Sequence, residues 1–351
     1  MWSATPGTSE AGQSYAKPTV TRVQIAGAER YLAIVGTGVD YSDTQNLKGR
    51  VVSAYDLVTG AVLWKFQAKC PVTTDVSAFE TDDTLETGGT KLPTLDGYID
   101  RVVFADMCGY VYKLDPAVDL AGAYYQNTGM GTIAANVTPD GKTQYALFST
   151  ATTAGALGQQ RAIAGTIAAR TDASTRMVLF FGTGGIESVS STTANAFYGI
   201  YADTGVIRSK VAGTCKNGVC EKFYGGVIVT PTQVIFTKTF DAAIGTNSCD
   251  SGSSTVSAVE LNPGTGTNFT SDFNLAVSSA IMGGLYGDAG AVYFATIAGD
   301  VARIGTPRAA TAGGDTVAKL PQQSGPGDVS GTGSFTGMSQ GFTLMGWRVV
   351  L

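Results

Sequence analysis

A short hairpin that recurs along the chain is the feature that most constrains its fold. Its clearest copy is GRVVSAYDLVTGAVLWKF, residues Gly49–Phe66. It reads as two antiparallel strands, Arg50–Asp56 and Ala61–Phe66, joined by a turn in which Gly60 can adopt a positive φ without a Cβ penalty. Related hairpin segments follow at Gly109–Pro116, Phe197–Arg208, Val256–Gly266 and Asp300–Thr306. A strand–turn–strand unit that repeats in this way indicates radial repetition of small sheets.

The composition agrees with an ordered all-β chain. Hydrophobic residues make up 44% of the 351 residues and charged residues 15%, which is typical of a globular protein. The 46 glycines, together with frequent threonine, valine and alanine, favour many short strands joined by tight turns. The net charge of −5 argues against a nucleic-acid partner, because binding to phosphates needs a basic surface.

The chain contains no histidine. This removes the commonest general base, the usual activator of a serine or cysteine nucleophile and the commonest ligand of transition metals. We therefore expect a protein that is not an enzyme.

The five cysteines include no C-x-x-C pair, so they fit the disulfides of an exported protein better than a metal site. No apolar run approaches the roughly 20 residues of a membrane span. The N-terminus has neither a basic nor an apolar signal region. The chain is thus either cytosolic or the mature or truncated part of an exported protein, and we favour the second interpretation.

Apolar runs bounded by turn residues predict five units of four strands after a lead-in at residues 1–16. The first two units are expected at Thr19–Ile25, Tyr31–Gly36, Arg50–Asp56 and Ala61–Phe66, and at Val76–Phe79, Arg101–Ala105, Tyr110–Leu114 and Gln144–Phe148. The third and fourth are expected at Ile163–Ala168, Met177–Gly182, Phe197–Tyr201 and Val206–Val211, and at Gly226–Thr230, Val234–Thr239, Val256–Leu261 and Asn268–Phe273. The fifth is expected at Met282–Tyr286, Ala291–Thr296, Val301–Ile304 and Thr316–Leu320.

Repeated four-stranded antiparallel units predict a β-propeller, because radial packing protects sheet edges that would otherwise pair with other chains. No linker interrupts residues 17–351, so they are expected to form a single domain. Another strand within Phe335–Leu351 is expected to close the ring against the first unit.

Two cysteine pairs are candidates for disulfides. Cys215 and Cys220 flank Asn217-Gly218, a strong signal for a two-residue turn, and would close a small hairpin. Cys70 follows the first unit and Cys108 lies in a turn of the second, so neighbouring blades could bring them together. Five cysteines allow many pairings and leave one unpaired, for which Cys249 is the candidate, so the connectivity stays open.

Several blocks resemble, in order, the C-terminal propeller of the PilC/PilY family, proteins associated with the tip of bacterial type IV pili. The first hairpin is also similar to the repeat of PQQ-type propellers, with its Asp-x-x-Thr-Gly turn and Trp-bearing strand. The blocks that resemble the family are KPTVTRV at 17–23, DGYIDRVVFADMCGYVYKLDP at 96–116, MVLFFGTGG and FYGIYADTG at 177–185 and 197–205, VIFTKTF with the downstream Cys249 at 234–249, and the closing GFTLMGWRVVL.

The resemblance implies a propeller of about seven blades that forms the C-terminal domain of a longer protein. It also implies a non-enzymatic role in pilus biogenesis, twitching motility and adhesion, supporting pilus extension and surface attachment. The expected partners are the minor pilins of the tip complex and a host or surface receptor. The expected location is the pilus tip or cell surface, reached through the periplasm and outer membrane.

The loop Leu92–Asp100 lies where the resemblance implies a calcium loop with acidic residues at alternate positions. Calcium takes several oxygen ligands, and Asp96, Asp100 and Thr94 are the candidates here. Leu92 and Thr94 replace two of the expected acidic residues, so the motif is degenerate. The alternative is an ordinary turn, in which Asp96-Gly97 supplies the bend and Asp100 caps the following strand.

Two other functions remain open. A PQQ-like scaffold of the periplasm or outer membrane would share the repeat, although no lipobox cysteine lies near the N-terminus. A quinoprotein dehydrogenase would need bound quinone and calcium, and we expect no PQQ here.

The glycine-rich GTGG at 182–185 lacks the Lys-Ser/Thr of a phosphate loop and is interpreted as a turn.

Overall fold

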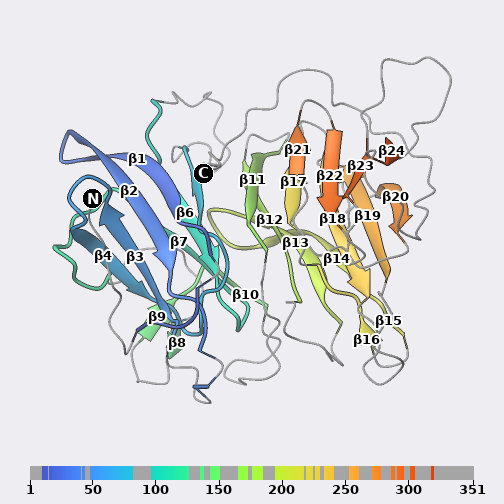
Figure 1. Cartoon of the computed structure of the whole chain (residues 1–351), viewed down its shortest axis with the longest axis horizontal. Coiled ribbons are helices and arrows are strands. Elements are labelled where there is room, and N and C mark those ends of the chain that lie inside the picture. Colours follow the sequence, from blue (N-terminus) through green and yellow to red (C-terminus); the bar gives the residue numbers. More distant parts are fainter. Residues whose placement is uncertain are drawn as a thin grey trace.

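Every described element in a computed structural model of the chain is a β-strand (Figure 1). The structure describes residues 10–14, 16–40, 42–43, 48–81, 96–125, 135–137, 143–150, 165–172, 176–184, 194–216, 219–223, 226–229, 233–240, 253–260, 271–277, 286–288, 291–295, 301–304 and 318–319. The closing strand predicted within Phe335–Leu351 lies outside these residues, as does Cys249.

The described strands form four-stranded antiparallel sheets, numbered here in chain order. The first sheet contains β1 (Thr19–Ile25), β2 (Ala28–Gly36), β3 (Val51–Asp56) and β4 (Val62–Gln67). The second contains β5 (Ser77–Phe79), β6 (Arg101–Ala105), β7 (Tyr110–Leu114) and β10 (Phe148–Ser149). The third contains β11 (Ala168–Thr171), β12 (Met177–Gly182), β13 (Ala196–Tyr201) and β14 (Ile207–Ala212).

The remaining strands complete two further sheets of the same kind and two small hairpins. The fourth sheet contains β17 (Val227–Val229), β18 (Gln233–Phe240), β19 (Ser253–Glu260) and β20 (Ser271–Val277). The fifth contains β21 (Tyr286–Asp288), β22 (Ala291–Ala295), β23 (Val301–Ile304) and β24 (Ala318–Lys319). The hairpins are β8 (Ala135–Val137) with β9 (Thr143–Tyr145), and β15 (Cys215–Lys216) with β16 (Val219–Cys220).

Several predicted strands differ from the structure in their limits. β20 and β21 extend beyond the C-terminal ends of the predicted strands Asn268–Phe273 and Met282–Tyr286 and overlap them only in part. Two further differences concern strand pairing. The predicted strand Gln144–Phe148 is divided: β9 pairs with β8, and only β10 joins the second sheet, with Phe148 opposite Val111. The first strand of the third sheet begins at Ala168, where the prediction ended, because its register sets Ala168 opposite Phe180. In both places the partner strand, and not the local apolar run, determines which residues pair.

Consecutive sheets pack face to face through their alternating side chains. Between the first and second sheets, Phe66 of β4 lies 5.5 Å from Phe104 of β6 and 5.1 Å from Tyr112 of β7, measured between ring centroids. On the other face of the second sheet, Val103 and Val111 belong to a core shared with the third sheet.

Strand β12 shows the alternation most clearly. Its Leu179 and Phe181 join the core shared with the second sheet, whereas Val178 and Phe180 join the core shared with the fourth. Successive residues of a strand point to opposite faces, so β12 is buried on both sides. Sheets that are stacked in chain order through both faces have the packing of β-propeller blades (Figure 1). The number of blades in the complete ring stays a prediction.

A segment that follows β7 covers the outer edge of the first sheet. Leu63 O on β4 accepts hydrogen bonds from Leu120 N at 2.9 Å and Gly122 N at 3.1 Å. A parallel bridge then joins Lys65 to Tyr124. The indole N–H of Trp64 donates to Pro116 O at 3.2 Å. This segment, residues 116–125 and here called the strap, satisfies an edge that could otherwise pair with another chain.

Candidate functional site

The candidate site lies where the chain crosses from the first sheet to the second. Strand β4 ends at Gln67, and residues 68–76 lead to β5. The β6–β7 turn, residues 106–109, meets this crossover, and Met107 N donates to Pro71 O at 2.9 Å. The turn and the crossover therefore hold the two sheets together at one end.

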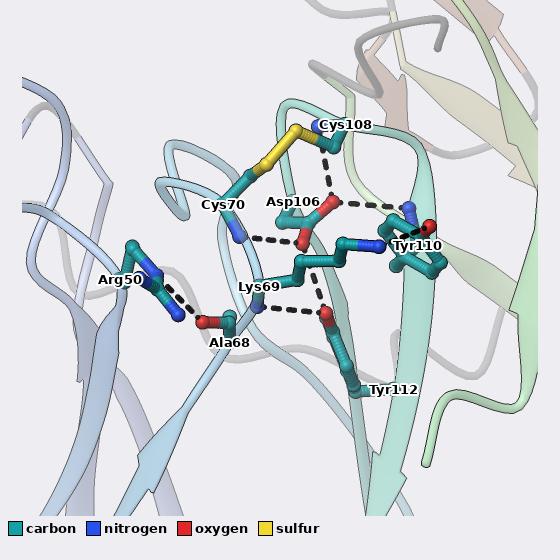
Figure 2. The surroundings of a disulfide bond; sticks show 8 residues. All are labelled: Arg50, Ala68, Lys69, Cys70, Asp106, Cys108, Tyr110 and Tyr112. Carbon is teal, nitrogen blue, oxygen red and sulfur yellow. Dashed lines mark hydrogen bonds between the residues drawn. A yellow bond between two sulfur atoms is a disulfide. The ribbon is translucent and has the colours of Figure 1, made fainter. Parts of the chain in front are cut away.

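A disulfide joins Cys70 of the crossover to Cys108 of the turn (Figure 2). The two cysteines are 38 residues apart in sequence, and their Cα atoms lie 5.7 Å apart. Cys70 is 2% exposed, and Cys108 is partly buried against the same core. This is one of the two pairs that the sequence favoured.

Asp106 lies at the centre of this junction with no solvent exposure. Its Oδ1 accepts from Cys108 N and Tyr110 N, both at 3.0 Å. Its Oδ2 accepts from Cys70 N at 3.0 Å and from the Tyr112 hydroxyl at 2.9 Å. The carboxylate thus binds the backbone N–H groups of both cysteines, which belong to two different sheet regions (Figure 2).

Burial raises the pKa of Asp106 to about 7, because it removes water from the charged form. The hydrogen bonds from Tyr110, Tyr112, Cys70 and Cys108 oppose this by favouring the carboxylate. The pKa of Tyr112 is raised well above its usual value by burial and then by the adjacent Asp106 charge. Asp106 is therefore a buried acid that titrates near neutral pH.

Two buried cations flank the disulfide. Lys69 is 7% exposed, and its Nζ donates to the Tyr110 hydroxyl at 2.9 Å. The Lys69 backbone N–H donates to the Tyr112 hydroxyl oxygen at 3.0 Å. Arg50 is 2% exposed, and its Nε donates to Ala68 O at 2.9 Å (Figure 2). These contacts attach Ala68 to Arg50, which precedes β3, and Lys69 to Tyr110 and Tyr112 on β7.

Sequence reasoning did not identify Asp106, Lys69 or Arg50. An aspartate two residues before Cys108, followed by Gly109 with a φ of +84°, is a recognisable turn signal. The burial of Asp106, however, results from the crossover of the other sheet, which no local pattern encodes.

The second predicted cysteine pair closes the β15–β16 hairpin. Cys215 and Cys220 are directly opposite each other in the ladder and form a disulfide. Next to it, Glu221 accepts from Thr214 N at 2.7 Å and from the Thr214 hydroxyl at 3.0 Å. This hairpin lies in the crossover from the third to the fourth sheet, so both disulfides belong to connections between sheets.

The described part of the predicted calcium loop forms a turn on the first sheet. Asp96 Oδ1 accepts from Tyr98 N at 2.9 Å, and Gly97 has a φ of +82°. Gly97 O accepts two hydrogen bonds from the Arg22 guanidinium, at 3.1 and 3.0 Å. The sequence prediction that Asp96-Gly97 could supply a bend agrees with this geometry.

Asp100, the other candidate carboxylate, accepts from Thr81 N at 2.8 Å. Its pKa is raised, chiefly by burial. Calcium takes about six to eight oxygen ligands, so two carboxylates would need others, and Thr94 lies outside the described residues. Within the part that the structure describes, no three Cys, Asp or Glu side chains gather to hold a metal ion. Calcium binding stays a prediction.

The glycine-rich segment at 182–184 ties strands together. The Thr183 hydroxyl oxygen accepts from Ala196 N at 2.9 Å, and Thr183 O accepts from Phe223 N at 2.8 Å. Thr183 thus connects the end of β12 to Ala196 and Phe223. Gly185 lies outside the described residues, so the turn that the sequence predicts for GTGG stays a prediction.

Among the residues that the structure describes, none belongs to a helix long and apolar enough to cross a membrane.

Comparison with known proteins gives structural matches only. No family model matches the chain, and no curated protein matches it. The C-terminal domain of Pseudomonas aeruginosa PilY1 matches with 14% identity and a TM-score of 0.47, over 90% of this chain and 74% of that one. Quinohemoprotein alcohol dehydrogenase from Comamonas testosteroni matches with 11% identity and a TM-score of 0.43, over 93% of this chain and 48% of that one. The β-propeller domain of Myceliophteria thermophila Cps50 (Swd1) matches with 10% identity and a TM-score of 0.40, over 82% of this chain and 70% of that one.

Proposed function

We propose that this chain is a non-enzymatic β-propeller module of type IV pilus biogenesis and adhesion. It acts at the pilus tip or cell surface, where it supports pilus extension and surface attachment. Its partners are the minor pilins of the tip complex and a host or surface receptor. Calcium bound at the loop 92–100 modulates this activity.

The observation that carries the proposal is the position of the sequence blocks that resemble the PilC/PilY family. The block at 96–116 contains β6, β7 and the turn between them. The blocks at 177–185 and 197–205 contain β12 and most of β13, and the block that begins at 234 falls on β18. The block at 17–23 falls on the edge strand β1, whereas from the second sheet to the fourth the resemblance follows inner strands in chain order. It therefore does not depend on one chance motif.

The two disulfides support an exported location. Disulfides form and persist in oxidising compartments and are rare in the cytosol. Both lie in connections between sheets: Cys70–Cys108 joins a crossover to a turn of the second sheet, and Cys215–Cys220 closes a hairpin within a crossover. A stable framework leaves the connecting loops to vary and to bind partners.

The test is a count of surface pili by electron microscopy in cells that lack the gene for this chain. These cells are compared with cells that carry the intact gene and with cells that express residues 1–351 behind an export signal. Expression of the same residues without the signal is the matched control. We expect loss of pili without the gene and restoration by the intact gene, while the cells that export residues 1–351 show whether these residues suffice.

Normal pili and normal adhesion in the deletion strain would contradict the proposal. Reduction of an electron-acceptor dye by the purified chain, after addition of quinone and calcium, would instead indicate a dehydrogenase. We expect no such activity.

A further inference from the structure

The backbones around the Cys70–Cys108 disulfide are held by contacts that do not involve sulfur. Asp106 binds the N–H of Cys70 through Oδ2 and the N–H of Cys108 through Oδ1, both at 3.0 Å. The Tyr112 hydroxyl donates to Asp106 and accepts from Lys69 N, next to Cys70. The crossover and the turn are thus joined through one carboxylate as well as through the disulfide.

We propose that Asp106 is a positioning residue for the formation of the Cys70–Cys108 disulfide. In the reduced protein it holds the two cysteine backbones side by side, which raises the effective concentration of one thiol near the other. This role concerns maturation of the fold and is independent of the pilus function proposed above.

The oxidant is a disulfide-carrying molecule, either a small thiol disulfide or a disulfide-exchange protein. Cys108 is the less buried of the two cysteines, so its thiolate attacks first and forms a mixed disulfide as one oxidant thiol leaves. The Cys70 thiolate then attacks the Cys108 sulfur and releases the second oxidant thiol. The protein loses two electrons and two protons, and the oxidant gains both.

The second disulfide does not need such a residue. Cys215 and Cys220 are separated by only five positions and face each other across the β15–β16 ladder. Their hairpin brings the thiols together, whereas Cys70 and Cys108 are 38 residues apart and lie in different sheet regions. Closing the longer separation costs more chain entropy, so positioning matters more there.

The charge of Asp106 should affect this positioning, because an ionised carboxylate binds N–H donors more strongly than a neutral carboxyl. The titratable and charged groups that face it are Tyr112 and Tyr110 on β7 and Lys69 on the crossover, whose Nζ binds Tyr110. With a pKa near 7, Asp106 gains its charge between pH 6 and 8. Disulfide formation should therefore become more favourable over this interval.

The experiment measures the equilibrium of each cysteine pair against glutathione in the purified chain. After acid quenching and alkylation, mass spectrometry of the peptides gives the oxidised fraction of Cys70–Cys108 and of Cys215–Cys220. For Asp106→Asn we expect the effective concentration of the Cys70 and Cys108 thiols to be roughly tenfold lower. A change of this size is expected when a charge-assisted hydrogen bond is lost. The second pair should be unchanged. Glu221→Gln, which alters the carboxylate beside the second pair, is the matched control and should leave the first pair unchanged.

Equal effective concentrations in wild type and Asp106→Asn would overturn the proposal. An equal decrease at both pairs would also overturn it, because it would indicate general loosening of the fold. If Asp106→Asn does not fold, the wild-type protein still provides the test. The ratio of the two effective concentrations should rise several-fold in favour of Cys70–Cys108 between pH 6 and 8. A constant ratio would contradict the assignment.

Discussion

At the scale of single residues, the junction between the first two sheets depends on the buried side chain of Asp106. Among the residues that the structure describes, hydrogen-bond donors, and not a cation, contact its carboxylate. Asp106 is fully buried, and four donors surround its carboxylate. Three of these donors are backbone N–H groups, which would lose their partner if the side chain were removed. An unpaired buried donor costs about 1–3 kcal/mol, so this aspartate is difficult to replace.

The raised pKa of Asp106 predicts that stability falls as pH rises. Its pKa is about 7 in the folded protein against the usual 3.8 of an aspartate, so the folded state binds the proton more tightly than the unfolded state. The stabilisation is fully present below the unfolded pKa and is lost as pH rises through about 7. Between pH 5 and 8 we expect Asp106 to reduce the free energy of unfolding by on the order of 2 kcal/mol.

The measurement is urea unfolding of the oxidised protein at several pH values, compared with Asp106→Asn. The amide does not titrate, so the variant should lack this part of the pH dependence although it is less stable overall. Parallel pH profiles for the two proteins would show that Asp106 does not titrate in this interval.

At the scale of elements, two sheets use the same local device. Gly36-Thr37-Gly38 and Gly182-Thr183-Gly184 both begin at the last residue of the second strand of a sheet. The hydroxyl oxygen of each threonine accepts from a backbone N–H at the start of the third strand, Val51 N at 3.1 Å and Ala196 N at 2.9 Å. The sequence could predict turns at both places, but not the strand partners that make the repeats equivalent.

The strap over β4 should depend on a small polar cluster. Glu10 accepts from Lys65 Nζ at 2.9 and 3.0 Å and from the Tyr124 hydroxyl at 2.6 Å. Burial, followed by the Glu10 interaction, raises the pKa of Tyr124 to about 12. The Lys65 N–H donates to Ala123 O, and the Tyr125 N–H donates to Lys65 O. We expect Glu10→Ala to increase amide hydrogen exchange severalfold at Lys65 and Tyr125, because local opening of the strap breaks these two hydrogen bonds.

The control for the strap is Glu29→Ala, which removes a carboxylate on the same sheet that binds Arg22. It should leave exchange at Lys65 and Tyr125 as in wild type. Equal exchange in Glu10→Ala and wild type would mean that backbone pairing alone holds the strap.

Calcium binding at the loop 92–100 is a second prediction for an element. If calcium binds the folded protein, millimolar calcium should raise the melting temperature by mass action. Asp96→Ala combined with Asp100→Ala should abolish the shift, although loss of the contacts to Tyr98 N and Thr81 N will itself lower stability. Magnesium is the control, since it requires a tighter octahedral site. No shift in wild type would rule out a functional site here.

At the scale of the whole molecule, the sequence predicted the strands better than their assembly. The continuous apolar runs of β12 and β13 and the glycines at turns are local properties, so these elements were predictable within a residue or two. The β8–β9 hairpin and the short β10 were not, because the predicted strand Gln144–Phe148 is divided between them and β10 is defined by its pairing with the distant β7. Cys70 and Cys108 were a plausible pair among many, but Asp106 between them required the structure.

The two disulfides should contribute unequally to the stability of the whole chain. A disulfide restricts the unfolded chain more strongly when it closes a longer loop. Cys70–Cys108 closes a separation of 38 residues and Cys215–Cys220 one of 5. Replacing both cysteines of the first pair with serine should lower the free energy of unfolding by about 4 kcal/mol, against about 2 kcal/mol for the second pair.

The serine variants also distinguish a junction between sheets from a local staple. Cys70 and Cys108 connect the first and second sheets, so their loss should loosen the core around Phe66 and Phe104 as well as the crossover. Loss of Cys215–Cys220 should affect only its own hairpin. Urea unfolding gives the two free energies, and amide hydrogen exchange shows where each variant opens. Equal destabilisation, with exchange changed only near the replaced cysteines, would mean that the core packing alone holds the first two sheets together.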